Sequence, residues 1–120
     1  MTPGIDSSQP RRGEIWLASL GNARPGEPGK SRPVVVVAAD EFAPYALTDL
    51  VPVVPLSLSR APSPSRVLLP ARAGFDGDSV AVCRAVRGIP RNRLHLRLAN
   101  LAAEELASLS HALAMTLGLA

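Results

Sequence analysis

The sequence contains few of the residues on which enzymes usually rely for catalysis. Among its 120 residues there is one cysteine, Cys83, and there are two histidines, His95 and His111. A single cysteine excludes an intrachain disulfide and a zinc site made of cysteines. No pair of carboxylates is spaced as an acid and a base would be, and no glycine-rich phosphate loop precedes a helix. Nucleotide-binding folds that depend on such a loop are therefore excluded.

The few reactive side chains have structural explanations. His95 lies in the alternating stretch 94–97, and His111 lies on the polar side of an expected helix. We interpret both as ordinary surface or partly buried histidines, with a two-histidine ribonuclease as the alternative. Cys83 lies in an apolar strand and is expected to be a core residue. Asp76 and Asp78 flank a glycine and favour a turn, because the rest of a calcium loop is absent.

The sequence also lacks a long uninterrupted hydrophobic run. Its longest apolar stretch, 101–119, contains Glu104, Glu105 and His111, and is too polar to span a membrane. Residues 1–10 are polar and contain no apolar signal core. We therefore expect a soluble, cytoplasmic protein without a membrane partner, in which residues 1–10 form a flexible tail and residues 11–120 a single domain.

The basic residues that are present are almost all arginines. Lys30 is the only lysine among 13 basic residues, and the net charge is +3. Five arginines and no acid lie between Arg84 and Arg97. Clustered guanidinium groups suit phosphate, because each planar fork can bind two oxygens, so the cluster favours a nucleic-acid partner. The alternative is a GC-rich genome that encodes basic residues as arginine.

The local patterns predict a small β-barrel with one helix. We expect strands at residues 14–20, 32–39, 50–58, 66–70 and 79–86, and a loop or short helical turn at 87–93. Pro52 and Pro55 remove ladder donors and indicate an edge, a bulge or a bent strand. The connections are too short for parallel crossovers, so the sheet should be mostly antiparallel. Ile15, Leu17 and Trp16 are candidates for the core.

The last element is expected to be a helix. Asn100 is a plausible N-cap, and Glu104 and Glu105 lie in the first turns, where they favour the helix dipole. Leucines recur at helical spacing along the segment, and Gly118 can end it. The C-terminal half is apolar on several sides, which suits burial against more than one surface; a monomer with a thicker core is the alternative.

Four segments resemble the MazF/PemK toxin family in the same order and spacing. Residues 12–17 (RGEIWL) are similar to its first strand, and residues 26–37 (GEPGKSRPVVVV) are similar to its glycine-rich loop followed by Arg-Pro and a valine-rich strand. Residues 53–57 (VVPLS) look like its Pro-apolar-Thr/Ser strand end, and residues 78–82 (DSVAV) like its Asp-Ser-Val strand start, followed by Arg87. The resemblance covers about residues 11 to 118.

This resemblance implies a mainly β fold, an SH3-like antiparallel barrel of the CcdB, Kid and MazF type with a C-terminal helix. It implies a homodimer that cleaves single-stranded RNA at short sequence motifs without a metal or other cofactor. By this likeness, the site residues are Arg32 and Ser57 as the catalytic pair, and Glu27, Lys30, Arg84 and Arg87 beside the RNA. The sequence departs from the family at Ala85, where an amide side chain is common, and at Ser57, where threonine is commoner; both departures leave the base preference open.

The expected chemistry uses the nucleophile that RNA itself carries, because the 2′-OH can attack the neighbouring phosphorus. Arg32 can stabilise the added negative charge, and the Ser57 hydroxyl can orient the reacting groups. The general base and acid are not evident in the sequence, and Glu27 is a weak candidate for the base. A MazE-like antitoxin should carry an acidic segment with apolar anchors that binds the same basic groove. Phe42 or Tyr45, both in an expected loop, could stack a base or could pack back on the barrel as loop anchors.

Two other functions are compatible with this kind of barrel. One is a CcdB-like gyrase poison, although those toxins act through a C-terminal tail that contains tryptophan, whereas this chain ends in Leu-Gly-Leu-Ala. The other is an RNA-binding barrel that has lost its activity. Cleavage of single-stranded RNA in the presence of EDTA separates the three.

Overall fold

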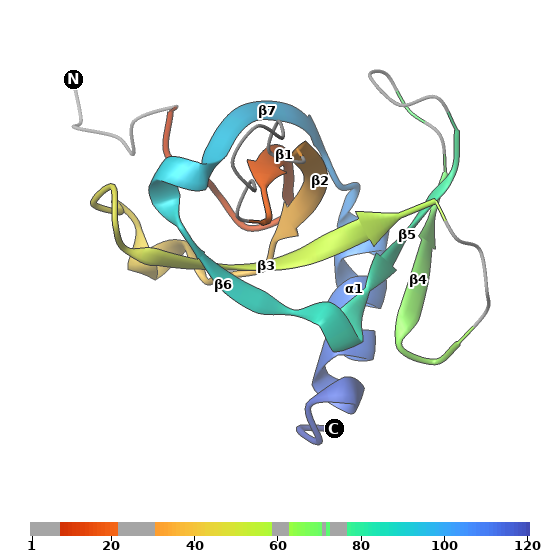
Figure 1. Ribbon diagram of the computed structural model, residues 1–120. Coiled ribbons are helices and arrows are strands. Elements are labelled where there is room, and N and C mark those ends of the chain that lie inside the picture. The colour runs from red at the N-terminus through yellow and green to blue at the C-terminus, as the bar shows by residue number, and fades with distance from the viewer. Residues whose placement is uncertain (1–7, 22–30, 59–62, 71, 73–76) are drawn as a thin grey trace.

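In the computed structural model, residues 8–21, 31–58, 63–70, 72 and 77–120 are described (Figure 1). Within these residues the chain forms seven strands, three short 3-10 turns and one helix. The strands are β1 (Glu14–Ser19), β2 (Ser31–Val36), β3 (Leu50–Ser57), β4 (Arg66–Leu69), β5 (Ser79–Val82), β6 (Arg87–Pro90) and β7 (Leu94–Asn100). The 3-10 turns are η1 (Asp40–Phe42), η2 (Cys83–Ala85) and η3 (Arg91–Arg93), and the helix is α1 (Ala103–Thr116).

The strands form an antiparallel barrel-like sheet in the order β4-β5-β3-β2-β1-β7, with β6 paired to β3. Every pairing is antiparallel, which confirms the predicted sheet type. The predicted mainly β fold with one C-terminal helix is confirmed, and the helix runs past the sheet to a protruding C-terminus (Figure 1).

The long strand β3 holds the two halves of the sheet together. Its first half pairs with β6, its middle with β2, and its last two residues with β5. Pro52 and Pro55 therefore mark a bent strand shared by two sheets, and not an edge strand. A strand that changes partners along its length needs fewer ladder donors at the points of change, so proline is tolerated there.

Two apolar clusters lie on opposite faces of this sheet. The barrel interior contains Trp16, Ala18, Val34, Val36, Val51, Val53, Ile89 and Leu94. The outer cluster joins the sheet to α1 and contains Ile15, Val35, Val54, Leu56, Ala81, Cys83 and Leu109. Alternate residues of each strand enter alternate clusters, because successive side chains of a strand point to opposite faces. The predicted core positions of Ile15, Trp16 and Cys83 are confirmed, whereas Leu17 is only half-buried.

The segment that precedes β1 contacts both the end of β2 and the helix α1. Gly13 has φ +88, and a Cβ there would lie 3.2 Å from a methyl group of Leu106. The Arg12 guanidinium donates to the carbonyl of Val37 and to Ser110 Oγ, so it joins the end of β2 to α1. Pro10, which we predicted to lie in a flexible tail, is fully buried.

Three local predictions differ from the structure. The strand predicted at 79–86 ends at Val82, where η2 begins. The segment 87–93 contains the strand β6, which its composition of one glycine and one proline in four residues conceals. Asn100 ends β7 instead of capping α1; Ala102 is the N-cap, and Glu105 Oε1 accepts a hydrogen bond from its N–H at 2.8 Å. Among the described residues, no helix is long and apolar enough to cross a bilayer.

Candidate active site

Arg32 and Ser57 each lie two residues beyond the last paired residues of β2 and β3. Val34 pairs with Pro55, Val35 with Val54 and Val36 with Val53. The same register, continued by two residues, would set Arg32 opposite Ser57, although the last two residues of β3 pair with β5. Both side chains of the predicted pair therefore lie at the same end of the barrel.

Arg32 and Ser57 continue the face that lines the barrel interior. Arg32 precedes Val34 and Val36 by whole two-residue steps, and Ser57 follows Val53 in the same way. Arg32 is exposed, Ser57 is half-buried, and Val34 and Val53 have no exposed surface. Among the described residues, the side chain of Arg32 makes no hydrogen bond or ion pair, so its guanidinium is available to an anion.

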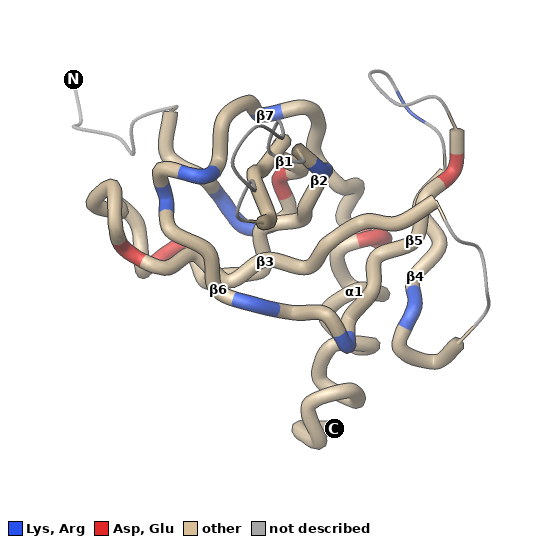
Figure 2. Tube along the Cα trace, viewed as in Figure 1, with Lys and Arg blue, Asp and Glu red and all other residues tan. Residues whose placement is uncertain are grey.

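Arg87 lies on the same face from the other side of β3. It pairs with Val53 and is two residues before the buried Ile89. Its Nη1 donates to the carbonyl of Leu20 at 3.2 Å, and Arg93 Nη1 lies 3.4 Å from the carbonyl of Gly21. Both arginines therefore hold the end of β1 while remaining beside the open end of the barrel. Figure 2 shows basic residues at β2, along β6 and in the connection to β7. We call Arg32, Ser57 and Arg87 the barrel-mouth site.

Arg84, also predicted to contact RNA, lines a different hollow. This hollow has a volume of about 320 Å³, and its other lining residues are Ser63, Pro64, Ser65, Met115 and Thr116. Arg84 thus lies beside the C-terminal end of α1, where a cation complements the helix dipole. Glu27 and Lys30 lie outside the described residues.

A hydrogen bond that the sequence does not suggest lies next to this end of the barrel. Ser19 Oγ is 2.7 Å from His95 Nε2, and Ser19 pairs with Ser31, the neighbour of Arg32. His95 is exposed at an irregularity in the pairing of β1 with β7, where Leu17 pairs with Leu96 but Ala18 pairs with Leu94. Such a bulge redirects side chains. The alternation around His95 predicted exposure, but no sequence signal indicated its partner.

The remaining candidate groups have structural roles. Cys83 is fully buried, and burial raises the pKa of its thiol, so it is not a ready nucleophile. Tyr45 packs on the interior cluster and anchors its loop, whereas Phe42 is 68% exposed. His111 is exposed on α1, as predicted. No cluster of three or more histidine, cysteine, aspartate or glutamate side chains suited to a metal occurs within the described ranges.

Comparison with known proteins places the chain in a family. The model of the PemK-like, MazF-like toxins of type II toxin–antitoxin systems matches residues 11–117. The chain belongs to this family of RNA-cleaving toxins. It is 30% identical over 110 residues to the endoribonuclease MazF of Staphylococcus saprophyticus. The alignment covers 91% of this chain and 92% of that protein. The family resemblance predicted from the four sequence segments is thereby confirmed.

Solved structures of MazF toxins share the fold. MazF in a MazE–MazF complex from Deinococcus radiodurans superposes with a TM-score of 0.76 at 26% identity, covering 92% of this chain and 97% of that one. The toxin MazF-mt6 of Mycobacterium tuberculosis gives a TM-score of 0.75 at 23% identity, covering 89% of this chain and 98% of that one. The SH3-like toxin barrel predicted from the resemblance is confirmed by these likenesses.

Proposed function

We propose that this chain is the toxin endoribonuclease of a type II toxin–antitoxin pair, which cleaves single-stranded RNA, including mRNA, at short sequence motifs and thereby arrests growth. The observation that supports the proposal is the placement of an exposed Arg32 and a half-buried Ser57, each two residues beyond the last paired residues of β2 and β3. Membership of the toxin family and the likeness to an endoribonuclease support it.

In the proposed reaction, the ribose 2′-oxygen forms a bond to the adjacent phosphorus and the bond from phosphorus to the 5′-oxygen breaks. One product ends in a 2′,3′-cyclic phosphate and the other in a 5′-OH. Arg32 has a planar fork that can donate two hydrogen bonds to the non-bridging oxygens, where negative charge accumulates in the transition state. The Ser57 hydroxyl holds the 2′-OH or the scissile phosphate in line for attack.

The proposed role of Arg87 is to hold the RNA backbone and not to act in the chemical step. Its guanidinium is already bound to the carbonyl of Leu20, which fixes its position beside β3. Each phosphate contact releases condensed counterions, so affinity for RNA should fall steeply as salt is raised. Arg84, on the separate hollow near α1, extends the basic surface for longer RNA.

Two protein partners complete the proposal. The first is a second copy of the chain, because the end of α1 leaves Met115, Leu117 and Leu119 between 50% and 77% exposed. The second is a MazE-like antitoxin whose acidic segment with apolar anchors occupies the basic mouth in place of RNA. A MazE–MazF complex is known for the Deinococcus radiodurans relative.

The deciding experiment compares single-stranded RNA with the same strand carrying one 2′-deoxy substitution at a mapped cut site, both in EDTA. We expect the first to be cut with cyclic-phosphate ends, and the second to bind but not be cut. Cutting of the deoxy strand at the normal rate would refute the mechanism. Absence of any cutting across a mixed RNA pool would instead favour the inactive RNA-binding barrel, and inhibition of gyrase would favour the CcdB-like alternative.

Variants of the pair test the roles of its members. Arg32→Ala should lower the rate about 10²–10³-fold, because it removes one donor to the developing charge. Arg32→Lys keeps the charge without the fork and should recover only part of that loss. Ser57→Thr retains the hydroxyl and serves as the matched control for Ser57→Ala. An active Arg32→Ala enzyme, or equal activities for the two Ser57 variants, would reject the assignment.

A further inference from the structure

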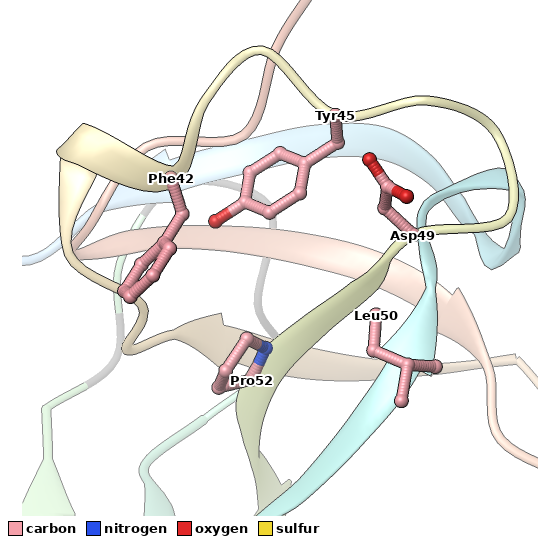
Figure 3. Close-up of a pocket in the computed structure, with 5 residues that line it drawn as sticks. All are labelled: Phe42, Tyr45, Asp49, Leu50 and Pro52. Carbon is pink, nitrogen blue, oxygen red and sulfur yellow. The ribbon is translucent and has the colours of Figure 1, made fainter.

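A hollow at the other end of β3 has no part in the barrel-mouth site. It has a volume of about 360 Å³ and is lined by Phe42, Tyr45, Asp49, Leu50 and Pro52. The five side chains surround one open space, with the two aromatic rings on one side and the Asp49 carboxylate on the other (Figure 3). Ser57 is five residues after Pro52 along β3, which corresponds to roughly 17 Å of strand. We call this hollow the acidic pocket.

The floor of the acidic pocket is an apolar sheet face that nothing in the described chain covers. Val54 and Leu56 lie on the same face of β3 and are buried in the cluster beneath α1. Leu50 lies beyond the reach of the helix and is 63% exposed. Phe42 is 68% exposed and Leu47 is 69% exposed. Large apolar side chains gathered in this way mark interaction sites on soluble proteins.

Asp49 lines the pocket, and the segment 38–50 that contains it is negatively charged in a chain whose net charge is positive. The segment 38–50 contains Asp40, Glu41 and Asp49 and no basic residue. Among the described residues, none of these three carboxylates has an ion-pair partner. Asp40 and Asp49 accept backbone N–H groups at 2.8 Å, which fixes their positions without neutralising them.

Arg12 and Arg91 each donate a backbone N–H to the segment 38–50, but their side chains point elsewhere. The N–H of Arg12 donates to Asp40, but its guanidinium binds the carbonyl of Val37 and Ser110 Oγ. The guanidinium of Arg91 donates to the carbonyl of Leu94 at 3.1 Å and lies 5.2 Å from the Trp16 ring centre. The negative charge at the pocket is therefore left for an external cation.

The pocket is held in shape before any partner arrives. The Gln9 side chain accepts from the Tyr45 N–H at 2.9 Å and donates to the Tyr45 carbonyl at 3.4 Å. The Tyr45 ring is 9% exposed and packs on the interior cluster. A site fixed in this way loses little conformational entropy on binding.

We propose that the acidic pocket binds a segment of a partner polypeptide that carries arginine or lysine beside a large apolar side chain. The apolar side chain fills the hollow over Leu50 and Pro52. The cation lies against the exposed face of Phe42 and beside Asp40 and Asp49, where cation–π and charge attraction act together. RNA is a poor occupant, because its phosphates would face these carboxylates. The opposite charges of the pocket and the barrel mouth thus select different partners.

The probe for the test is a fluorescein-labelled peptide with an Arg-Leu-Arg-Leu-Arg core, and its control is the same peptide with glutamate in place of arginine. Anisotropy with the full chain measures affinity, and amide chemical shifts locate the peptide. We expect the arginine peptide alone to bind, to perturb residues 40–52, and to weaken as salt is raised. No RNA is present, so the outcome does not depend on the cleavage activity.

Variants separate the pocket from other surfaces. Phe42→Ala should weaken the peptide at least tenfold, as loss of an aromatic anchor does. Asp40→Asn combined with Asp49→Asn keeps both backbone hydrogen bonds and should weaken peptide binding several-fold. Leu68→Ala changes an apolar residue on β4 that is 57% exposed and lies outside the pocket, and should have no effect. Equal binding of the glutamate peptide, or shifts outside the pocket, would overturn the proposal. Conversion of a dimer to a monomer by Phe42→Ala would also overturn it, because the face would then join two copies of this chain.

Discussion

The buried carboxylate of Glu14 offers a sharp test of how the barrel is held closed. Glu14 is 6% exposed on β1. Its Oε1 accepts from the Arg11 N–H at 2.7 Å and from Trp16 Nε1 at 3.1 Å, and its Oε2 accepts from Arg97 Nη1 at 3.0 Å. One acid therefore ties together the entry to β1, the largest ring of the interior cluster and strand β7.

Replacement of Glu14 by alanine should remove all three of these hydrogen bonds. The indole N–H of Trp16 would be left buried without an acceptor, which costs about 1–3 kcal/mol. Arg97 would lose its carboxylate, but its side chain is 45% exposed and can turn to water, so this share is at most about 1 kcal/mol. With the lost Arg11 contact, the free energy of unfolding should fall by about 2–5 kcal/mol in total.

Glu14→Gln separates the hydrogen bonds from the charge. Because the Arg11 and Trp16 donors share one oxygen, the glutamine carbonyl can accept from both, and only the contact with Arg97 is lost. The expected cost is about 1 kcal/mol. Urea unfolding at one fixed protein concentration, with the slope compared between variants, measures both. Equal losses for the two variants, or a loss below 1 kcal/mol for alanine, would refute this account of the network.

Three further predictions concern single side chains. Leu109→Ala should lower the free energy of unfolding by about 2–5 kcal/mol in urea titration, because Leu109 is fully buried between α1 and the sheet; a loss below 1 kcal/mol would contradict this packing. The hydrogen bond from the Arg72 side chain lowers the pKa of Glu105 below its ordinary value of 4.5. The contact with Arg72 therefore stabilises the fold above pH 4.5, and this stabilisation is lost as pH falls through the folded pKa. Glu105→Gln should therefore unfold at a lower temperature than the parent protein at pH 7, and the two unfolding temperatures should converge in acid. Burial, together with Asp40, raises the pKa of Tyr45 above 10.0; ultraviolet titration of this single tyrosine should show the rise, and Asp40→Asn should reduce it.

Among the strands that the sequence predicted, those with an unbroken β-branched or alternating pattern agree best with the structure, but β7 was not predicted although residues 94–97 alternate. β1 and β2 deviate by a few residues at most from their predicted ranges, and β3 was found despite two prolines. β6 was missed because only Ile89 among its four residues is an apolar β-former, and its pairing with β3 supplies what its own composition lacks. Tertiary pairing can impose a strand on a segment whose local preference is weak.

The candidate site was predictable only in part. The likeness to the toxin family singled out Arg32 and Ser57, which lie two residues beyond the last paired residues of β2 and β3. Nothing in the spacing of the arginines showed that Arg84 would face the end of α1 and a different hollow. The acidic pocket was not predicted either, because its exposed Leu50 and Phe42 look like ordinary strand and loop residues until the limits of the helix are known.

The position of Arg32 and Ser57 just beyond the β2–β3 pairing has an evolutionary consequence. Their place is set by the pairing of Val34–Val36 with residues 53–55, and not by the segments that precede Ser31 and follow Ser57 in the sequence. Those segments can change in length and composition while the strands that carry the two residues stay paired. Grafting them between relatives should therefore change which bases are selected while the bond-breaking apparatus is inherited intact.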